Sequence, residues 1–199
     1  HFQPYPFRFS RFKAAFEQNL KDRKLRILFA EGFILMGCLV TVFNYISYHL
    51  LEAPFQLSQS WIGLISIAYL AGIYSSSKAA QWSFKYGRAK VLPLMLLMMI
   101  AGLLITLIPA LWAILLGLII FAFAFFAAHS TASSWVSVQA IQYRAVAASL
   151  YLFCYYIGSS LLGSSGGLIW ENFGWIGINL SVVLVLAFGL ILSIHLKAL

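Results

Sequence analysis

The sequence predicts an all-α polytopic membrane protein with six transmembrane helices, and its composition, apolar stretches and charge distribution all indicate this fold. Of the 199 residues, 62% are hydrophobic and 9% are charged, whereas soluble domains are about 45–50% apolar and about 25% charged. This balance excludes a soluble domain and a disordered chain. The two cysteines are too few for a disulfide scaffold.

Apolar stretches long enough to cross about 30 Å of hydrocarbon occur six times. The predicted spans are residues 27–51, 60–77, 91–108, 111–128, 145–169 and 175–196. Pro54 follows the first span, Pro93 lies in the first turn of the third, and Pro109 follows the third, where each is tolerated. A polar turn at residues 171–174 separates the last two spans. Residues 24–199 therefore form one predicted transmembrane domain.

The thirteen basic residues lie in alternate connecting segments. Seven lie within residues 1–26, four between the second and third spans, one between the fourth and fifth, and one after the sixth. With six spans, all these segments are on one side of the membrane, and the opposite loops hold Glu52 and Glu171 without Lys or Arg. Since positive residues mark the cytoplasmic side, both termini are predicted to be cytoplasmic. Topology thus explains the net charge of +8, and no nucleic-acid partner is expected.

Residues 1–23 form a predicted cytoplasmic linker before the first span. Its apolar residues recur at helical spacing, at Phe9, Phe12, Phe16 and Leu20. Because basic residues lie between them, a helix here would be amphipathic and would lie along the lipid headgroups. A solvated linker without fixed structure is the alternative. The chain begins with His1 rather than Met, and we expect it to be a piece of a longer protein.

Polar and aromatic side chains inside the spans are the candidate functional residues, because polar groups are costly in hydrocarbon. Asn44 and Tyr48 lie one turn apart in the first span. They either line an aqueous cavity, or Asn44 bonds a neighbouring helix. Phe121, Phe125 and His129 form a stripe in the fourth span. Packing is the favoured interpretation of the two phenylalanines, and His129 either titrates or, as we favour, is hydrogen-bonded at a helix interface.

Small residues predict close helix packing at Gly72 in the second span and, in the fifth, at Ser159, Gly163 and Gly167. Gly163 to Gly166 also matches the motif of intramembrane serine proteases, but the only later histidine lies at the opposite end of the next helix, so no enzyme is predicted. The four histidines and two cysteines lack metal-ligand spacing. Neither a metal nor a cofactor is therefore expected.

The loop between the second and third spans resembles the Asp-Arg-x-Gly-Arg-Arg/Lys loop of the major facilitator superfamily. In this loop, residues 84–92, Gly87 takes the place of the turn glycine, and Arg88 and Lys90 keep the loop positive. Residues 19–46 and 155–175 resemble the entry into the seventh helix and the eleventh-to-twelfth-helix region of bacterial efflux permeases in that superfamily. One departure is Phe84, which stands at the acidic position, so this gating loop is not expected to form the family's charge relay.

The resemblance implies the C-terminal half of a twelve-helix transporter, built from two inverted three-helix units, with the N-terminal half missing. The first helix of each unit lines the central cavity in this family. The substrate contacts that it implies are Asn44, Tyr48, Phe121 and Phe125, with Tyr45 and Tyr155 behind them. The implied function is export of a small organic compound by proton antiport and alternating access in a bacterial inner membrane.

Proton coupling needs an acid in the membrane, and Glu31, in the first turns of the first span, is the one acid inside the predicted spans. Glu31 and His129 are the candidate proton-linked residues. For Glu31, we favour an ion pair with a nearby basic residue over a helper role, and we expect the coupling acid in the missing half. The alternative to half a transporter is a self-pairing six-helix protein, either a scaffold or a half-size transporter, joined through Gly163 and Gly167.

Overall fold

The computed structural model of the protein describes residues 9–198, and every regular element in that range is helical. In chain order the elements are α1 (Phe9–Lys21), α2 (Arg23–Leu51), α3 (Gln59–Leu64), the 3-10 turn η1 (Ile65–Ile67), α4 (Ala68–Tyr86), α5 (Arg88–Ile105), α6 (Leu111–Gln139) and α7 (Arg144–Ala198). Residues 1–8 of the predicted linker lie outside the described range.

Helix α1 forms in the predicted linker, in place of the alternative without fixed structure. Ala15 and Asn19 are its buried residues, whereas Phe16 and Leu20 remain more than a third exposed. The helix ends at Lys21. The next residue, Asp22, caps α2, because its Oδ1 accepts hydrogen bonds from backbone N–H groups in the first turn of that helix. Its Oδ2 accepts a hydrogen bond from Nε2 of Gln139 at 2.9 Å. Asp22 therefore ties the corner between α1 and α2 to the end of α6.

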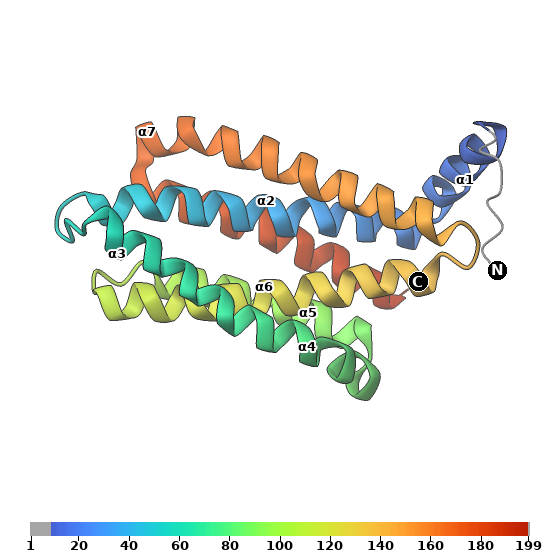
Figure 1. The fold of residues 1–199 in the computed structure, drawn as a ribbon, viewed down its shortest axis with the longest axis horizontal. Coiled ribbons are helices and arrows are strands. Elements are labelled where there is room, and N and C mark those ends of the chain that lie inside the picture. The colour runs from blue at the N-terminus through green and yellow to red at the C-terminus, as the bar shows by residue number, and fades with distance from the viewer. Residues whose placement is uncertain (1–8, 199) are drawn as a thin grey trace.

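Helix α7 is two antiparallel arms. Its 55 residues would extend about 80 Å at 1.5 Å per residue, far more than one bilayer crossing needs. Gly174 interrupts it with φ 58° and ψ −150°, a backbone conformation that glycine adopts readily. We call residues 144–173 the first arm and residues 175–198 the second arm. In Figure 1 the second arm, in red, runs back beside α2, so the chain turns where the sequence predicts a turn.

Four helices in the described range, α2, α5, α6 and α7, are long and apolar enough to cross a bilayer. The protein is therefore an all-helical polytopic membrane protein. The fifth and sixth predicted spans fall in the two arms of α7. The second predicted span, residues 60–77, falls in α3, η1 and α4, which continue as helix to Tyr86.

Two further helices end away from the predicted ends of their spans. Helix α5 ends at Ile105, before the predicted residue 108, because residues 106–108 form a turn ahead of Pro109. Helix α6 continues to Gln139, eleven residues beyond the predicted end at residue 128. Its last turns are polar yet helical, and the hydroxyls of Ser133, Ser134 and Ser137 are satisfied by carbonyls of their own helix.

The helices form two groups that meet at the centre. Helix α2 packs between the two arms of α7, and α6 packs against α4 and α5. Helices α2 and α6 also contact each other. In Figure 1 the first arm, α2, α4 and α6 lie toward the viewer, and α5 and the second arm lie behind them. The molecule therefore has two different faces, one formed by each set of helices.

Glycines allow the closest helix contacts. A Cβ on Gly158 of the first arm would overlap the backbone carbonyl of Phe33 in α2. Between α5 and α6, a Cβ on Gly102 would lie 2.8 Å from the carbonyl oxygen of Gly117. Backbones this close leave no room for a side chain.

The predicted packing residues differ in how closely they pack. A Cβ on Gly72 would overlap the ring of Phe126, and one on Gly163 would lie 2.9 Å from Cγ1 of Val40. Gly167 is looser, with the Tyr45 hydroxyl 3.5 Å from its Cβ position. Ser159 is half-buried, and its hydroxyl donates to a carbonyl of its own helix.

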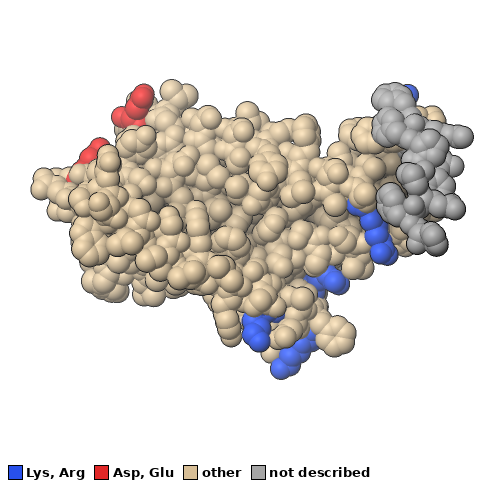
Figure 2. All heavy atoms as spheres, in the orientation of Figure 1, with Lys and Arg blue, Asp and Glu red and all other residues tan. Residues whose placement is uncertain are grey.

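Charge separates along the length of the bundle. On the face drawn in Figure 2, Lys and Arg atoms gather toward the end that carries α1 and the turn between α4 and α5. Asp and Glu atoms lie at the opposite end, where α2 ends and α7 turns. The sequence pattern of alternate basic segments thus becomes two ends of different charge.

The Gly158 contact gives a stability prediction. Gly158→Ala should lower the melting temperature of the purified protein or prevent its folding, because the new methyl group overlaps backbone that cannot move independently. Gly63→Ala in α3 is the control, since nothing lies within 4 Å of a Cβ there. Melting temperatures followed by circular dichroism measure both; equal stability of the two variants would contradict the close contact.

Candidate functional site

A groove of about 460 Å³ lies beside the second half of α2, and we call it the α2 hollow. Its lining residues come from α2 and α3: Phe43, Asn44, Tyr45, Ser47, Tyr48, Leu51, Gln59 and Ile62. Asn44 and Tyr48 are exposed there, which fits the cavity interpretation of Asn44 rather than the packed one. The volume lies in the usual range for small-molecule sites, and amides beside aromatic rings can hydrogen-bond and stack on a ligand.

Tyr45 holds the wall of this hollow against α7. Its side chain is 9% exposed, and its hydroxyl donates to the carbonyl oxygen of Gly163 at 3.1 Å. Trp170 lies beside it: the centroid of its ring is 6.1 Å from that of Tyr45 and 5.9 Å from that of Tyr48. Tyr45 therefore has a structural partner, whereas Tyr48 presents its ring to the hollow.

Phe121 and Phe125 do not reach either face. They are 0% and 1% exposed, inside the bundle, so the structure does not bring them to the surface that carries Asn44 and Tyr48. Phe121 lies where α6 packs against α5: a Cβ on Gly102 of α5 would lie 2.8 Å from the backbone nitrogen of Phe121. A helical spacing defines a face but not its neighbour, and these positions correct the expectation that both contact a substrate.

A second groove, the α6 hollow, has a volume of about 330 Å³ and lies between the second half of α6 and the first arm of α7. Its lining residues are His129, Ser130, Ser133, Ser134, Val136, Ser137, Ala148, Tyr151 and Leu152. The four serines recur at steps of three, one and three, which place them on one helix face. Sequence reasoning missed this polar stripe, although its spacing is visible in the sequence.

His129 joins the α6 hollow to the first arm. Its Nδ1 and the Tyr151 hydroxyl are hydrogen-bonded at 3.0 Å, and its ring centroid lies 4.8 Å from that of Tyr155. The hydrogen-bonded interpretation of His129 therefore describes this conformation. Tyr155 is half-buried between His129 and the exposed Tyr156. The helices that line both hollows are α2, α3, α6 and the first arm, all on the viewer's side of Figure 1.

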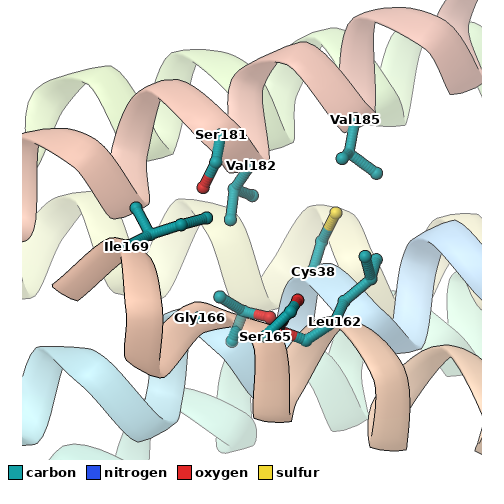
Figure 3. A pocket seen from close by; sticks show the side chains of 9 residues that line it. Cys38, Leu162, Ser165, Gly166, Ile169, Ser181, Val182 and Val185 are labelled. Carbon is teal, nitrogen blue, oxygen red and sulfur yellow. Dashed lines mark hydrogen bonds between the residues drawn. The ribbon is translucent and has the colours of Figure 1, made fainter. Parts of the chain in front are cut away.

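A third, smaller hollow of about 110 Å³ lies between the two arms of α7 and beside α2 (Figure 3). Thr41, Ser165 and Ser181 line it, but each hydroxyl donates to a carbonyl of its own helix. The space is too small for most organic ligands. Cys38 and Ser165 point toward it without a histidine among the residues that line it, so no nucleophile and base are paired there.

The gating loop contacts the α6 hollow. Gly87 joins α4 to α5 with φ 84°, a conformation that disfavours any residue with a side chain. Nε of Arg88 donates to Oγ of Ser134, a hollow residue, at 3.5 Å, and Lys90 is exposed. Phe84, at the position that is acidic in the superfamily, is 95% exposed. The loop is therefore linked to α6 through one weak hydrogen bond.

Glu31 is buried without a basic partner. It is 0% exposed, and neither carboxyl oxygen has a hydrogen-bond partner in the described part of the chain. The favoured ion pair with a basic residue is therefore wrong for residues 9–198. Spacing along one helix could not reveal this, because the surroundings of Glu31 come from α7.

Tyr45 and Tyr48 should respond differently to loss of the hydroxyl. Tyr45→Phe should destabilise the protein by about 0.6 kcal/mol, a typical value for a hydrogen bond between transmembrane helices, because the bond to Gly163 is lost. Tyr48→Phe should leave stability unchanged, since that side chain is 53% exposed. Reversible unfolding in mixed micelles measures both values; a larger loss in Tyr48→Phe would contradict the assignment.

The chain is similar to bacterial transporters. It is 48% identical to an uncharacterized transporter of Buchnera aphidicola subsp. Schizaphis graminum over 99% of this chain and 48% of that protein. It is 45% identical to the inner membrane transport protein YnfM of Escherichia coli, over 98% of this chain and 47% of that protein. It is 41% identical to the uncharacterized MFS-type transporter YybF of Bacillus subtilis, over 97% of this chain and 48% of that protein. No family model matches the chain.

The chain spans about half the length of these curated relatives. All three are named transporters, and two polar hollows on one face of an apolar helical bundle fit such a protein. The chain is therefore a relative of membrane transporters, one of them of the major facilitator type, and it is not an enzyme.

Proposed function

We propose that the chain is the C-terminal half of a secondary active transporter of the major facilitator superfamily, which exports a small organic compound by proton antiport and alternating access. The observation that carries the proposal is the match of almost the whole chain to about half of each relative. The chain's own order of elements supports the C-terminal half, since the basic helix α1 precedes the first span as a linker between halves would.

Six spans follow if the two arms of α7 are counted separately and α3 to α4 is counted as one. The packing supports two inverted three-helix units. Helix α2, which begins the first unit, packs against both arms of α7, and α6, which begins the second, packs against α4 and α5. Each unit's first helix thus packs on the last two helices of the other unit, as a twofold relation between the units requires.

The face that carries both hollows is the proposed contact with the N-terminal half. We propose that the substrate binds between the halves, against Asn44 and Tyr48 from α2 and Tyr155 from α7. These residues offer an amide, a phenol and an aromatic surface without a formal charge. Rocking of the halves would open the α2 hollow and the α6 hollow alternately.

The proposed orientation places both termini and the basic end of the bundle in the cytoplasm of a bacterial cell. The acidic residues Glu52 and Glu171 then lie outside, and α1 lies along the cytoplasmic headgroups. The E. coli relative is named an inner membrane protein, and we propose the same membrane for this chain. The self-pairing alternative loses its interface, because Gly163 and Gly167 are used by Val40 and Tyr45 of the same chain.

Transport tests the proposal directly. The full coding sequence around this chain is expressed in cells that lack their main efflux systems, and a library of toxic organic compounds is screened for increased tolerance. Everted vesicles then take up the protected compound when acidified inside. We expect gradient-driven uptake from the extended protein and none from the 199 residues alone. Uptake by the short chain, or no protected compound, would contradict the proposal.

The same vesicles test the substrate site. Asn44→Ala in the extended protein should reduce uptake while leaving the amount of folded protein unchanged, because the side chain is exposed in the α2 hollow. Gln59→Ala, at the α3 side of that hollow, probes its far wall. A sharp fall in folded protein with Asn44→Ala would instead support the packing interpretation.

A further inference from the structure

Glu31 lies inside the bundle with nothing to neutralise a negative charge. The side chain is fully buried and both carboxyl oxygens lack hydrogen-bond partners among residues 9–198. The one ion pair recorded in that range joins Lys13 and Glu17. Burial of an unpaired carboxylate is so costly that the group neutralises instead, by keeping its proton.

The two arms of α7 supply the surroundings of Glu31. The second arm contributes Gly189, whose Cβ position lies 3.3 Å from Oε2 of Glu31, so a glycine there makes room for the carboxyl. Its buried Ser193 is bonded to a carbonyl of its own helix, and its His195 is exposed. The titratable groups within electrostatic range are Cys38 on α2 and Tyr151 on the first arm.

Tyr151 connects this buried site to the α6 hollow. Its ring packs on α2 beside Glu31, since a Cβ on Gly32 would lie 2.8 Å from Cε2 of Tyr151. Its hydroxyl is bonded to Nδ1 of His129 at 3.0 Å. His129 and Tyr151 both line the hydroxyl-rich α6 hollow. Two titratable side chains therefore stand between Glu31 and that groove.

We propose that Glu31 is a proton-binding site in this half of the transporter, which exchanges its proton with the α6 hollow through Tyr151 and His129. The proposal rests on the proposed function for its role in coupling, and it deepens that function by assigning a coupling acid to this half instead of leaving it to the other. The expected ion pair of Glu31 with a basic residue, which argued against this role, is not formed among residues 9–198.

In the proposed release, the proton of Glu31 passes along a relay of side chains. The O–H bond of Glu31 breaks, and the proton reaches the Tyr151 oxygen through a water molecule admitted when the helices move, because the two side chains are not hydrogen-bonded in this conformation. Tyr151 gives its own proton to Nδ1 of His129, and His129 loses the proton on Nε2 to water in the hollow. Glu31 becomes a carboxylate, and Tyr151 and His129 remain neutral.

Infrared spectroscopy tests the protonated state without a substrate. The full-length protein in lipid at neutral pH should show the carbonyl stretching band of a protonated carboxyl. This band should disappear in Glu31→Gln and persist in Glu171→Gln, the matched control with an exposed side chain. Glu31→Asp, which keeps a carboxyl group, should shift the band and serves if Glu31→Gln folds poorly. A spectrum unaffected by any change at Glu31 would overturn the proposal.

Deuterium exchange tests the route. After transfer to D2O, the Glu31 band should shift on the order of a hundredfold more slowly in Tyr151→Phe, which lacks the relaying hydroxyl. Tyr156→Phe, an exposed neighbour, is the control and should exchange at the normal rate. An unchanged rate in Tyr151→Phe would overturn the relay. Both measurements are independent of transport. The Glu31 carbonyl band without gradient-driven uptake would reject the proposed antiport. Uptake without that band would reject Glu31 as the proton-binding site.

Discussion

The close contact between α2 and the first arm of α7 is the constraint on which the rest of the structure depends. At Gly158 the two backbones approach until a single methyl group would overlap the carbonyl of Phe33. Because the axes are this close, Tyr45 reaches the Gly163 carbonyl toward one end, and Tyr151 lies on Gly32 toward the other. Tyr45 in the wall of the α2 hollow and Tyr151 in the wall of the α6 hollow are therefore both held at one packed interface.

The architecture could be predicted from the sequence to the extent that it depends on apolar length and charge. Residues 23–51 and 88–105 are helices close to the predicted spans, α6 begins at the predicted residue 111, and Gly174 turns the chain at the predicted place. The end of α6 could not be predicted from polarity, because serine hydroxyls that bond their own helix remain compatible with it. The closest packing residue, Gly158, lies one position before the predicted Ser159, since a spacing of four selects a face only to within one residue.

The candidate site was less predictable, because it depends on which helix covers which face. Asn44 and Tyr48 reach a hollow as one alternative expected, whereas Phe121 and Phe125 are buried by neighbouring helices. Glu31 depends on a contact across more than 150 residues, with Gly189, and no local pattern encodes such a pairing. In physical terms, periodicity indicates that a face is buried, and the tertiary fold decides what buries it.

The two faces of the bundle differ in polarity. One face carries two polar hollows, and the second arm on the other presents apolar side chains such as Leu184 and Phe188, which are 71% and 57% exposed. Such a surface suits lipid, whereas hydroxyls, amides and a histidine suit contact with water.

Thiol accessibility in native membranes tests whether the face with the two hollows meets water and the second arm meets lipid. Single cysteines replace Asn44, Ser137, Leu184 or Phe188 in the full-length protein, with Cys38 and Cys154 changed to alanine, and a water-soluble maleimide is applied to both sides of the membrane. We expect cysteines at positions 44 and 137, in place of Asn44 and Ser137, to react with the maleimide. Cysteines in place of Leu184 and Phe188 should not react. Labelling on the second arm with protection of both hollows would contradict this expectation.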